Sequence, residues 1–166
     1  TLNANVYLDT MKQFLYEAVQ TDVDLDMPLF DSGKTETKDA LVIVIGSGKG
    51  LVGPLLHQLK SETYDLIKKL EAEGITPHLI SVKSKTLDVF RELNLKSEFH
   101  FSASFEEASA TEITPLKKVV LDYYPAKVQR VYVVFMRFKN AFIQEAVSEK
   151  FIPLSKEDFP QVSTSN

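Results

Sequence analysis

The chain contains no cysteine in its 166 residues. Disulfide bonds, thiolate metal sites and cysteine nucleophiles are therefore excluded for these residues, and the composition fits a reducing compartment. No apolar run approaches the roughly 20 residues that a membrane-spanning helix requires, so we expect no direct membrane insertion. The amino terminus has no basic segment followed by an apolar core, so we expect no secretory signal.

Positive charge is also scarce, because 19 Lys and Arg residues stand against 23 Asp and Glu residues, for a formal net charge of -4. Nucleic acids and anionic membrane surfaces bind basic faces, so this balance argues against both as partners. Hydrophobic residues make up 44% of the chain, as in ordinary globular proteins. A chain of this length is expected to form one soluble domain that buries roughly two-thirds of its unfolded surface.

The most informative segment is a buried strand followed by a glycine-rich turn and an amphipathic helix. Residues 41–45 are a continuous, largely β-branched apolar run, which is typical of a strand covered on both faces. The helix after the turn has apolar residues at three- and four-residue spacing from Leu56 to Leu70. Gly74 is expected to end this helix in a left-handed conformation. This order of elements predicts an open α/β sheet.

The alternation of strands and helices continues toward the carboxyl end. Further strands are predicted at residues 77–82, 98–102, 128–138 and 141–154. Asn94 is expected to close a short helix between the first two of these strands, and Pro115 either to interrupt the next helix or to begin a new one. Lys139 and Asn140 are predicted to form a tight turn, with Asn tolerating a positive φ, so that the last two strands pair antiparallel.

These elements predict a three-layer, Rossmann-like α/β domain with a mostly parallel sheet of about five strands and an antiparallel carboxyl-terminal edge hairpin. We expect residues 1–38 to form an amino-terminal helix (5–19) and a linker. The globular domain is expected over residues 39–155 and a flexible tail over residues 156–166.

The glycine-rich turn has two interpretations. Residues 48–53 match the G-x-G-x-x-G dinucleotide fingerprint, in which small residues let the backbone approach a pyrophosphate at a helix amino terminus. The acidic residue expected about 20 positions later is absent, although Lys83 or Lys85 could serve a phosphate-bearing variant. The sequence does not match the other phosphate-loop motif, G-x-x-x-x-G-K-[ST], because Gly50 follows Lys49 where the motif has Ser or Thr. The turn is therefore either the site of an NAD- or NADP-binding module or small oxidoreductase, or a bend that packs the helix close to the sheet.

No other residue pattern supports catalysis or metal binding. His57, His78 and His100 lack zinc-ligand spacing, and a G-x-S-x-G nucleophile elbow is absent. Residues 104–107 form a capping-box arrangement from Ser104 to Glu107, and Glu106 and Glu107 fit the first turn of the helix that it begins. The aromatic side chains near the carboxyl end are expected to pack the core and the hairpin: Tyr123, Tyr124, Tyr132, Phe135, Phe138 and Phe142. The sequence therefore assigns no catalytic, cofactor-binding or metal-binding residue.

Three segments together resemble the globular domain of the gamma subunit of F-type rotary ATP synthases. Residues 46–54 occupy the family turn T-S-D-R-G-L-C-G-G, with departures at Gly48, Val52 and Pro54. Residues 131–154 follow the family's last strand pair, V-Y-L-V-Y-N-x-F-x-S-A-x-x-Q through L-L-P-L, in the same register. Residues 27–30 resemble the family's H-P-L-L segment before the first strand. The departures indicate a divergent member or a gamma-like paralogue.

The resemblance implies a non-catalytic central-stalk subunit that couples rotation between the catalytic head and the membrane ring. Its implied partners are the alpha, beta and epsilon subunits and the c-ring, without nucleic acid, and its implied location is the cytoplasmic face of a bacterial membrane. It implies no cofactor. The family's long terminal coiled-coil helices have no counterpart in these 166 residues, so we expect an excised domain or flanks outside this sequence. One or two apolar faces should then lie uncovered where those helices or epsilon would dock.

Overall fold

The structure is a computed structural model that describes residues 13, 38–46, 53–102, 110–124 and 126–152. The predicted amino-terminal helix and linker, the capping box and the carboxyl-terminal tail lie outside these residues. The proposed division at residues 38 and 155 therefore stays a prediction.

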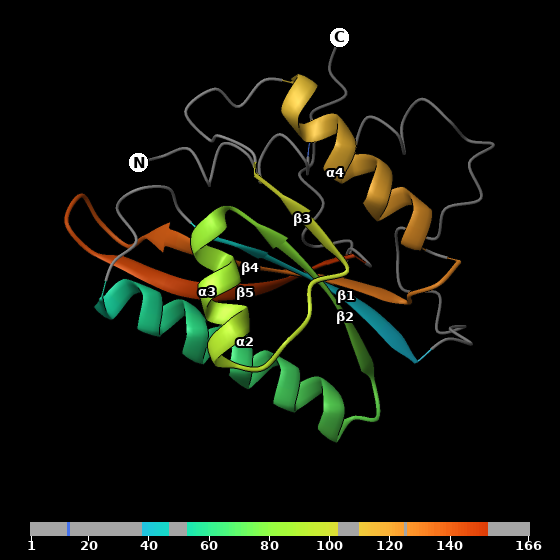
Figure 1. Ribbon diagram of the computed structural model, residues 1–166, viewed down its shortest axis with the longest axis horizontal. Coiled ribbons are helices and arrows are strands. Elements are labelled where there is room, and N and C mark those ends of the chain that lie inside the picture. The colour runs from blue at the N-terminus through green and yellow to red at the C-terminus, as the bar shows by residue number, and fades with distance from the viewer. Residues whose placement is uncertain (1–12, 14–37, 47–52, 103–109, 125, 153–166) are drawn as a thin grey trace, which may run out of the picture.

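The described residues form one five-stranded sheet with the strand order β3-β2-β1-β4-β5. Its neighbours are parallel except β4 and β5, which pair antiparallel at one edge (Figure 1). The strands are β1 (Asp39–Ile45), β2 (Thr76–Val82), β3 (Phe99–Phe101), β4 (Arg130–Phe138) and β5 (Gln144–Ile152). The predicted fold class, a mostly parallel sheet with an antiparallel edge pair, is confirmed.

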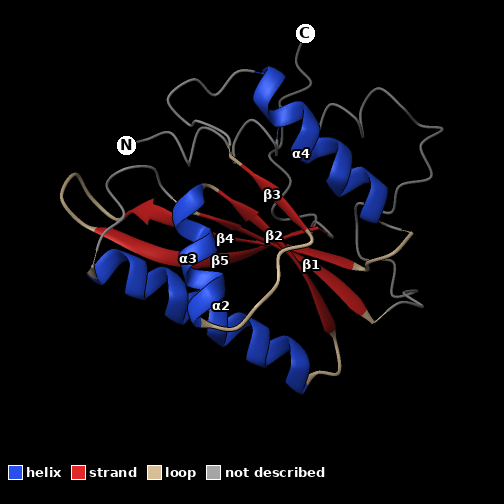
Figure 2. Ribbon diagram, viewed as in Figure 1, coloured by secondary structure: helices blue, strands red, loops and turns tan. Residues whose placement is uncertain are grey.

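Helices cover both faces of this sheet, which gives three layers (Figure 2). They are α2 (Pro54–Ala72), α3 (Ser84–Glu92) and α4 (Ala110–Tyr123). Side chains alternate across a strand, so Ile43 points toward the α4 side and Val42 toward the side of α2 and α3. Strand β1 is buried from Ala40 onward because it lies at the centre of the sheet under both helical layers.

The two cores are dense and almost entirely apolar. The core under α4 contains, among others, Leu41, Ile43, Ile80, Leu116, Val120, Val133 and Phe151. The core under α2 and α3 contains, among others, Val42, Leu59, Ile67, Leu70, Phe90, Val134 and Met136. Close packing on both faces of one sheet gives a body of low compressibility.

Two helices end as the sequence predicts. Gly74 has a φ of 77° and Asn94 a φ of 57°, so both lie in the left-handed region. The N–H of the following residue closes each end, with Ile75 donating to Leu70 and Leu95 donating to Phe90 at 2.8 Å. These i-to-i−5 bonds satisfy carbonyls that have no partner inside the helix.

Pro115 contradicts both predicted alternatives, because α4 runs through it without a break. Its side chain is exposed, so the intrahelical hydrogen bond that its ring removes is lost on the solvent side. Leu116 and Val120 hold the opposite side of the helix in the core. Tertiary packing therefore outweighs the local cost of the proline.

The hairpin also differs in detail from the prediction. Strand β4 begins at Arg130 rather than Val128, and β5 begins at Gln144 rather than Ala141. The connection closes through an N–H of Lys139 that donates to the carbonyl of Ile143 at 2.8 Å. Asn140 contributes through its side chain, which accepts N–H bonds from Phe142 and Ile143 at 2.8 and 2.9 Å. Its φ is not positive, so its role is an Asx-type turn.

Candidate functional site

Ligands of open α/β sheets bind beyond the carboxyl ends of the strands, at the point where connections change faces. In this sheet that point lies between β1 and β4, because β1 leads to α2 on one face and α4 leads to β4 from the other. The predicted glycine-rich turn follows β1 at this edge, and residues 47–52 of it lie outside the described residues. The residues beside the turn are described and can be assessed.

The backbone at the end of β1 is already hydrogen-bonded within the protein. The buried N–H of Gly46 donates to Oγ1 of Thr86 at 2.9 Å and to the carbonyl of Val82 at 3.1 Å. The Thr86 hydroxyl donates in turn to the same Val82 carbonyl at 2.7 Å. This triangle joins β1, β2 and α3. The N–H of Gly46 is therefore used for packing and is not presented to a phosphate.

Lys83 and Lys85, the residues proposed for a phosphate-bearing cofactor, lie at the start of α3. Lys83 precedes the helix with a φ of 82°, and its N–H donates to the carbonyl of Phe101 at 2.7 Å. This bond fixes the junction between β2 and α3 against β3. The backbone of Lys83 thus has a structural role.

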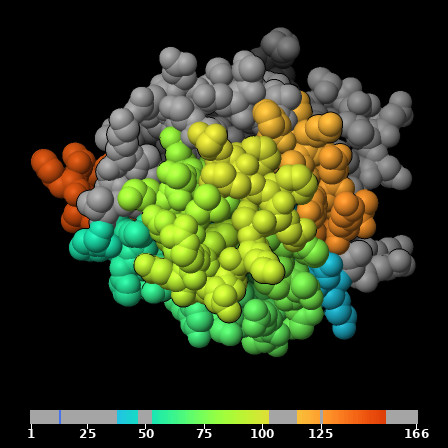
Figure 3. All heavy atoms as spheres, viewed as in Figure 1, coloured from blue at the N-terminus to red at the C-terminus, as the bar shows by residue number. Residues whose placement is uncertain are grey.

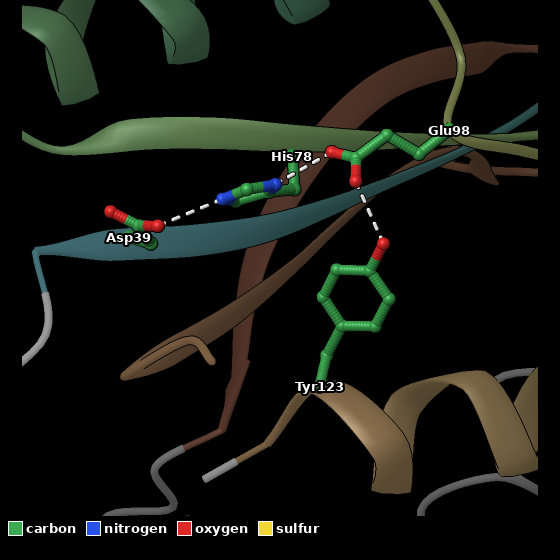
Figure 4. A network of polar contacts seen from close by, with 4 residues as sticks. All are labelled: Asp39, His78, Glu98 and Tyr123. Carbon is green, nitrogen blue, oxygen red and sulfur yellow. Dashed lines mark hydrogen bonds and ion pairs between the residues drawn. The ribbon is translucent and has the colours of Figure 1, made fainter. Parts of the chain in front are cut away.

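A polar cluster lies at the opposite end of the parallel strands, where they begin (Figure 4). His78 on β2 lies between two carboxylates: its Nε2 is 2.9 Å from Asp39 on β1, and its Nδ1 is 2.6 Å from Glu98 before β3. The second oxygen of Glu98 accepts a hydrogen bond of 2.7 Å from the phenol of Tyr123 on α4. The ring of Tyr123 also meets the imidazole edge-on, at 5.9 Å between centroids. We call these four residues the His78 cluster.

The His78 cluster changes the acidity of its members. Burial lowers the pKa of His78, but hydrogen bonds and charges from Asp39 and Glu98 outweigh burial and raise the pKa above 6.5. Burial, followed by the bond to the Glu98 carboxylate, raises the pKa of Tyr123 to about 12. Both effects favour the protonated form of the group.

The other two histidines lie apart from this cluster. His57 is exposed on α2, whereas His100 on β3 lies with its Nδ1 2.7 Å from the hydroxyl of Ser81. The Ser81 hydroxyl also bonds Ser97 at 2.8 Å. Among the described residues, no group of three or more His, Asp or Glu side chains is arranged to hold a metal ion.

The sequence pattern pointed to no partner for His78, neither Asp39 nor Glu98. The one indication that the sequence held of this contact was the position of each residue in its strand. Asp39 begins β1, and His78 comes two residues after the residue that pairs with it in the parallel register. Only the register of three strands and the end of α4 brings the four residues together.

A groove of about 550 Å³ lies between α2 and strands β4 and β5. Its charges are partly paired, since Arg130 bonds Glu73 at 3.3 Å and Ser148 donates to Glu62 at 2.9 Å. The groove is lined by Glu62, Asp65, Leu66, Lys69, Glu73, Arg130, Tyr132, Ser148 and Lys150. This mixed-charge lining contains no histidine.

The end of the hairpin carries the most exposed large hydrophobic side chain of the described residues. Phe142 is 95% exposed and Ile143 is 51% exposed. The prediction that Phe142 packs in the core or the hairpin is therefore wrong, whereas Tyr123, Tyr124, Tyr132 and Phe135 are buried as predicted. Figure 3 shows the hairpin end projecting from the edge of the molecule, at the left of the view. In the part of the chain that the structure describes, no helix has the length and apolar character needed to cross a membrane.

The fold places the chain in the class of Rossmann-like open α/β domains. The backbone at the end of β1 is used for packing within the protein. The model of the ATP synthase family matches the chain over residues 1–166. The chain belongs to the ATP synthase family.

Curated relatives agree with this assignment. The ATP synthase gamma chain of Delftia acidovorans is 28% identical over 131 residues, covering 78% of this chain and 45% of the relative. That of Methylibium petroleiphilum is 24% identical over 155 residues, covering 93% and 53%. The chain thus spans about half the length of these curated relatives.

Solved structures share the fold at low identity. A chain from the rotor of the Euglena gracilis mitochondrial ATP synthase has a TM-score of 0.51 at 15% identity, with 92% of this chain and 55% of that chain covered. A chain from the central stalk and c-ring of the Tetrahymena thermophila mitochondrial ATP synthase has a TM-score of 0.52 at 16% identity, with 92% and 73% covered.

Proposed function

We propose that this chain is the globular domain of a central-stalk gamma subunit in a rotary, proton-translocating ATP synthase. The observation that carries the proposal is the alignment of proteins named ATP synthase gamma chain with 78 to 93% of this chain. In this role the domain couples rotation between the catalytic head and the membrane ring. It is a non-catalytic subunit, and the chemistry of ATP belongs to other subunits of the complex.

The proposed partners are the alpha, beta and epsilon subunits and the c-ring. The proposed location is the cytoplasmic face of a bacterial membrane, where the domain would be held peripherally by the complex. Structures titled as rotor, F1 with c-ring, and central stalk with c-ring share this fold and support the choice of partners.

The packing of the domain suits the transmission of torque. Strand β1 is fully buried from Ala40 to Val44 and is sandwiched between two apolar cores. Hydrogen bonds join it on both sides to parallel strands, β2 and β4. A close-packed, three-layer body of this kind resists twisting because its interior has almost no free volume to yield.

The alternative from the sequence, a dinucleotide-binding module or small oxidoreductase, has less support. The N–H of Gly46, just before the fingerprint, is hydrogen-bonded to Thr86 and Val82 and is used for packing. The aligned relatives are named as gamma chains and not as dinucleotide enzymes. A rotor component accounts for both observations without a ligand.

Affinity purification of the tagged full-length gene product from its native cells tests this proposal. We expect the alpha, beta and epsilon subunits to purify with it, together with ATPase activity. A variant with a charge in the central strand, Ile43→Asp, should fail to recover them because a buried unpaired charge disrupts the fold. A folded wild-type protein that purifies without alpha and beta, from cells containing both, would contradict the proposal.

A further inference from the structure

The imidazole of His78 has a hydrogen-bond acceptor at each ring nitrogen. Nε2 lies 2.9 Å from a carboxylate oxygen of Asp39, and Nδ1 lies 2.6 Å from a carboxylate oxygen of Glu98. A neutral imidazole has only one N–H and can donate to one of them, whereas the imidazolium donates to both. The observed geometry therefore fits the doubly protonated ring.

Glu98 connects this ring to a different layer of the molecule. Its other oxygen accepts the Tyr123 hydroxyl at 2.7 Å, at the carboxyl end of α4 (Figure 4). Its backbone N–H donates to Leu79 of β2 at 2.8 Å, just before the three-residue strand β3. Strand β3 is the shortest of the described strands and pairs with β2 through three residues. The link from His78 through Glu98 therefore acts beside the bonds of Ser81 to Ser97 and His100 in holding this edge.

The charged and titratable groups around His78 come from every neighbouring element. Asp39 belongs to β1, Glu98 to the segment before β3, and Tyr123 to α4. Lys127, after α4, places its Nζ 5.1 Å from the centre of the Tyr123 ring. Among these groups the two carboxylates directly face the imidazole. Loss of the imidazolium charge therefore leaves two anions and a nitrogen lone pair at close range.

We propose that the His78 cluster is a protonation-dependent latch, which ties the carboxyl end of α4 and the amino end of β3 to the central strands while the imidazole is doubly protonated. When His78 loses the proton on Nδ1, its hydrogen bond to Glu98 is lost, so Glu98 and the Tyr123 hydroxyl that donates to it are no longer tied to β2. This inference goes beyond the proposed role as a stalk subunit and can be tested on the isolated chain.

The shift in the pKa of His78 agrees with a latch that closes when the imidazole is protonated. The carboxylates raise the pKa of His78 above 6.5 even though burial acts in the opposite direction. A folded-state pKa above the unfolded value means that the stabilisation is fully present below pH 6.5 and is lost as the pH rises through the folded value. The latch is therefore closed under mildly acidic conditions and opens toward alkaline pH.

An NMR titration of the labelled 166-residue chain between about pH 5.5 and about pH 9 tests the latch. We expect the His78 ring signals to titrate with a midpoint above 6.5. Amide protection factors, corrected for intrinsic exchange, should fall at Glu98–Phe101 and Val120–Tyr123 with the same midpoint. Amides in the buried strand β1 should not change in this way.

Three variants distinguish the latch from effects of pH or of substitution on the whole domain. H78Q should have lower protection at both segments at acidic pH and no midpoint, whereas H57Q, which changes an exposed histidine, should behave like the wild type. Y123F, which removes the bond to Glu98, should leave the His78 midpoint above 6.5 and the response of β3 intact but abolish the response of α4. If H78Q is too unstable for exchange measurements, Y123F and the wild-type titration remain decisive.

Two results would overturn the latch. One is a His78 midpoint at or below 6.5 in the folded wild-type chain. The other is protection at the end of α4 that follows pH in the same way in the wild type and in Y123F. Neither result bears on the stalk assignment, which depends on co-purification with other subunits.

Discussion

Gly46, at the end of β1, donates its backbone N–H to the hydroxyl oxygen of Thr86 on α3, 2.9 Å away in the interior. Thr86 is fully buried and also donates to the carbonyl of Val82. One side chain thus holds two parallel strands and a helix together at the edge where related folds bind nucleotides. This contact is why we interpret the edge beside the glycine-rich turn as scaffolding.

We expect Thr86→Val to destabilise the domain by about 1–3 kcal/mol. The substitution keeps the shape of the side chain but removes the hydroxyl that bonds Gly46 and Val82. Thr86→Ser is the matched control, because it keeps the hydroxyl and removes only a methyl group, and it should cost less. Urea unfolding monitored by circular dichroism measures both. Equal losses for the two variants would show that the hydroxyl contributes nothing.

NAD, NADP and ATP should not raise the melting temperature of the domain. A ligand present at 100 times its dissociation constant adds about 2.7 kcal/mol of stability, which a thermal-shift assay detects readily. The N–H of Gly46, already bonded to Thr86, is not free to hold a phosphate. A reproducible, saturable rise with any of the three nucleotides would favour the dinucleotide-binding alternative instead.

Phe90 and Phe142 should respond in opposite ways to replacement by alanine. Phe90 on α3 is 2% exposed and packs in the core shared with α2, so Phe90→Ala should cost about 3–5 kcal/mol. Phe142 is 95% exposed at the hairpin end, so Phe142→Ala should change the free energy of unfolding by no more than about 0.5 kcal/mol. Chemical denaturation of both variants provides the comparison. A large loss for Phe142→Ala would contradict the exposed position of that ring.

Alkaline pH should destabilise the domain through Tyr123. Burial and the Glu98 carboxylate raise its pKa from 10.0 to about 12 in the folded state. A raised folded-state pKa stabilises the fold fully below pH 10 and loses that contribution as the pH rises toward 12. The difference in melting temperature between wild type and Tyr123→Phe should therefore change over this interval. Subtracting the pH titration of absorbance of Tyr123→Phe from that of the wild type isolates the phenolate signal of Tyr123, which should appear near pH 12. A signal that appears near pH 10 would contradict the bond to Glu98.

The main features of the fold could be predicted because hydrophobic period and helix-ending residues are local signals. The apolar run at 41–45 gave the central strand, and Gly74 and Asn94 marked helix ends where a positive φ is needed. Pro115 could not be placed, because whether a helix tolerates proline depends on which side faces solvent. The exposure of Phe142 depends on the length of the hairpin connection, which the sequence pattern misjudged.

The His78 cluster could not be predicted from the sequence, for a different reason. His78, Glu98 and Tyr123 are separated by 20 and 25 residues, so no local pattern joins them. Their meeting depends on the parallel register of β1 with β2 and on where α4 ends. Sequence spacing can detect a metal or catalytic motif within one element, but not a contact that tertiary structure creates.

Single-molecule rotation tests the central claim of this account most directly. Since these 166 residues contain no cysteine, exposed Lys96 can be replaced as Lys96→Cys to attach a bead to this domain alone in a full-length protein with no other reactive cysteine. In complexes reconstituted with alpha and beta subunits and fixed through the head, we predict that ATP drives the bead in one direction. A bead that stays still on complexes that hydrolyse ATP would contradict the proposal that this domain turns with the central stalk.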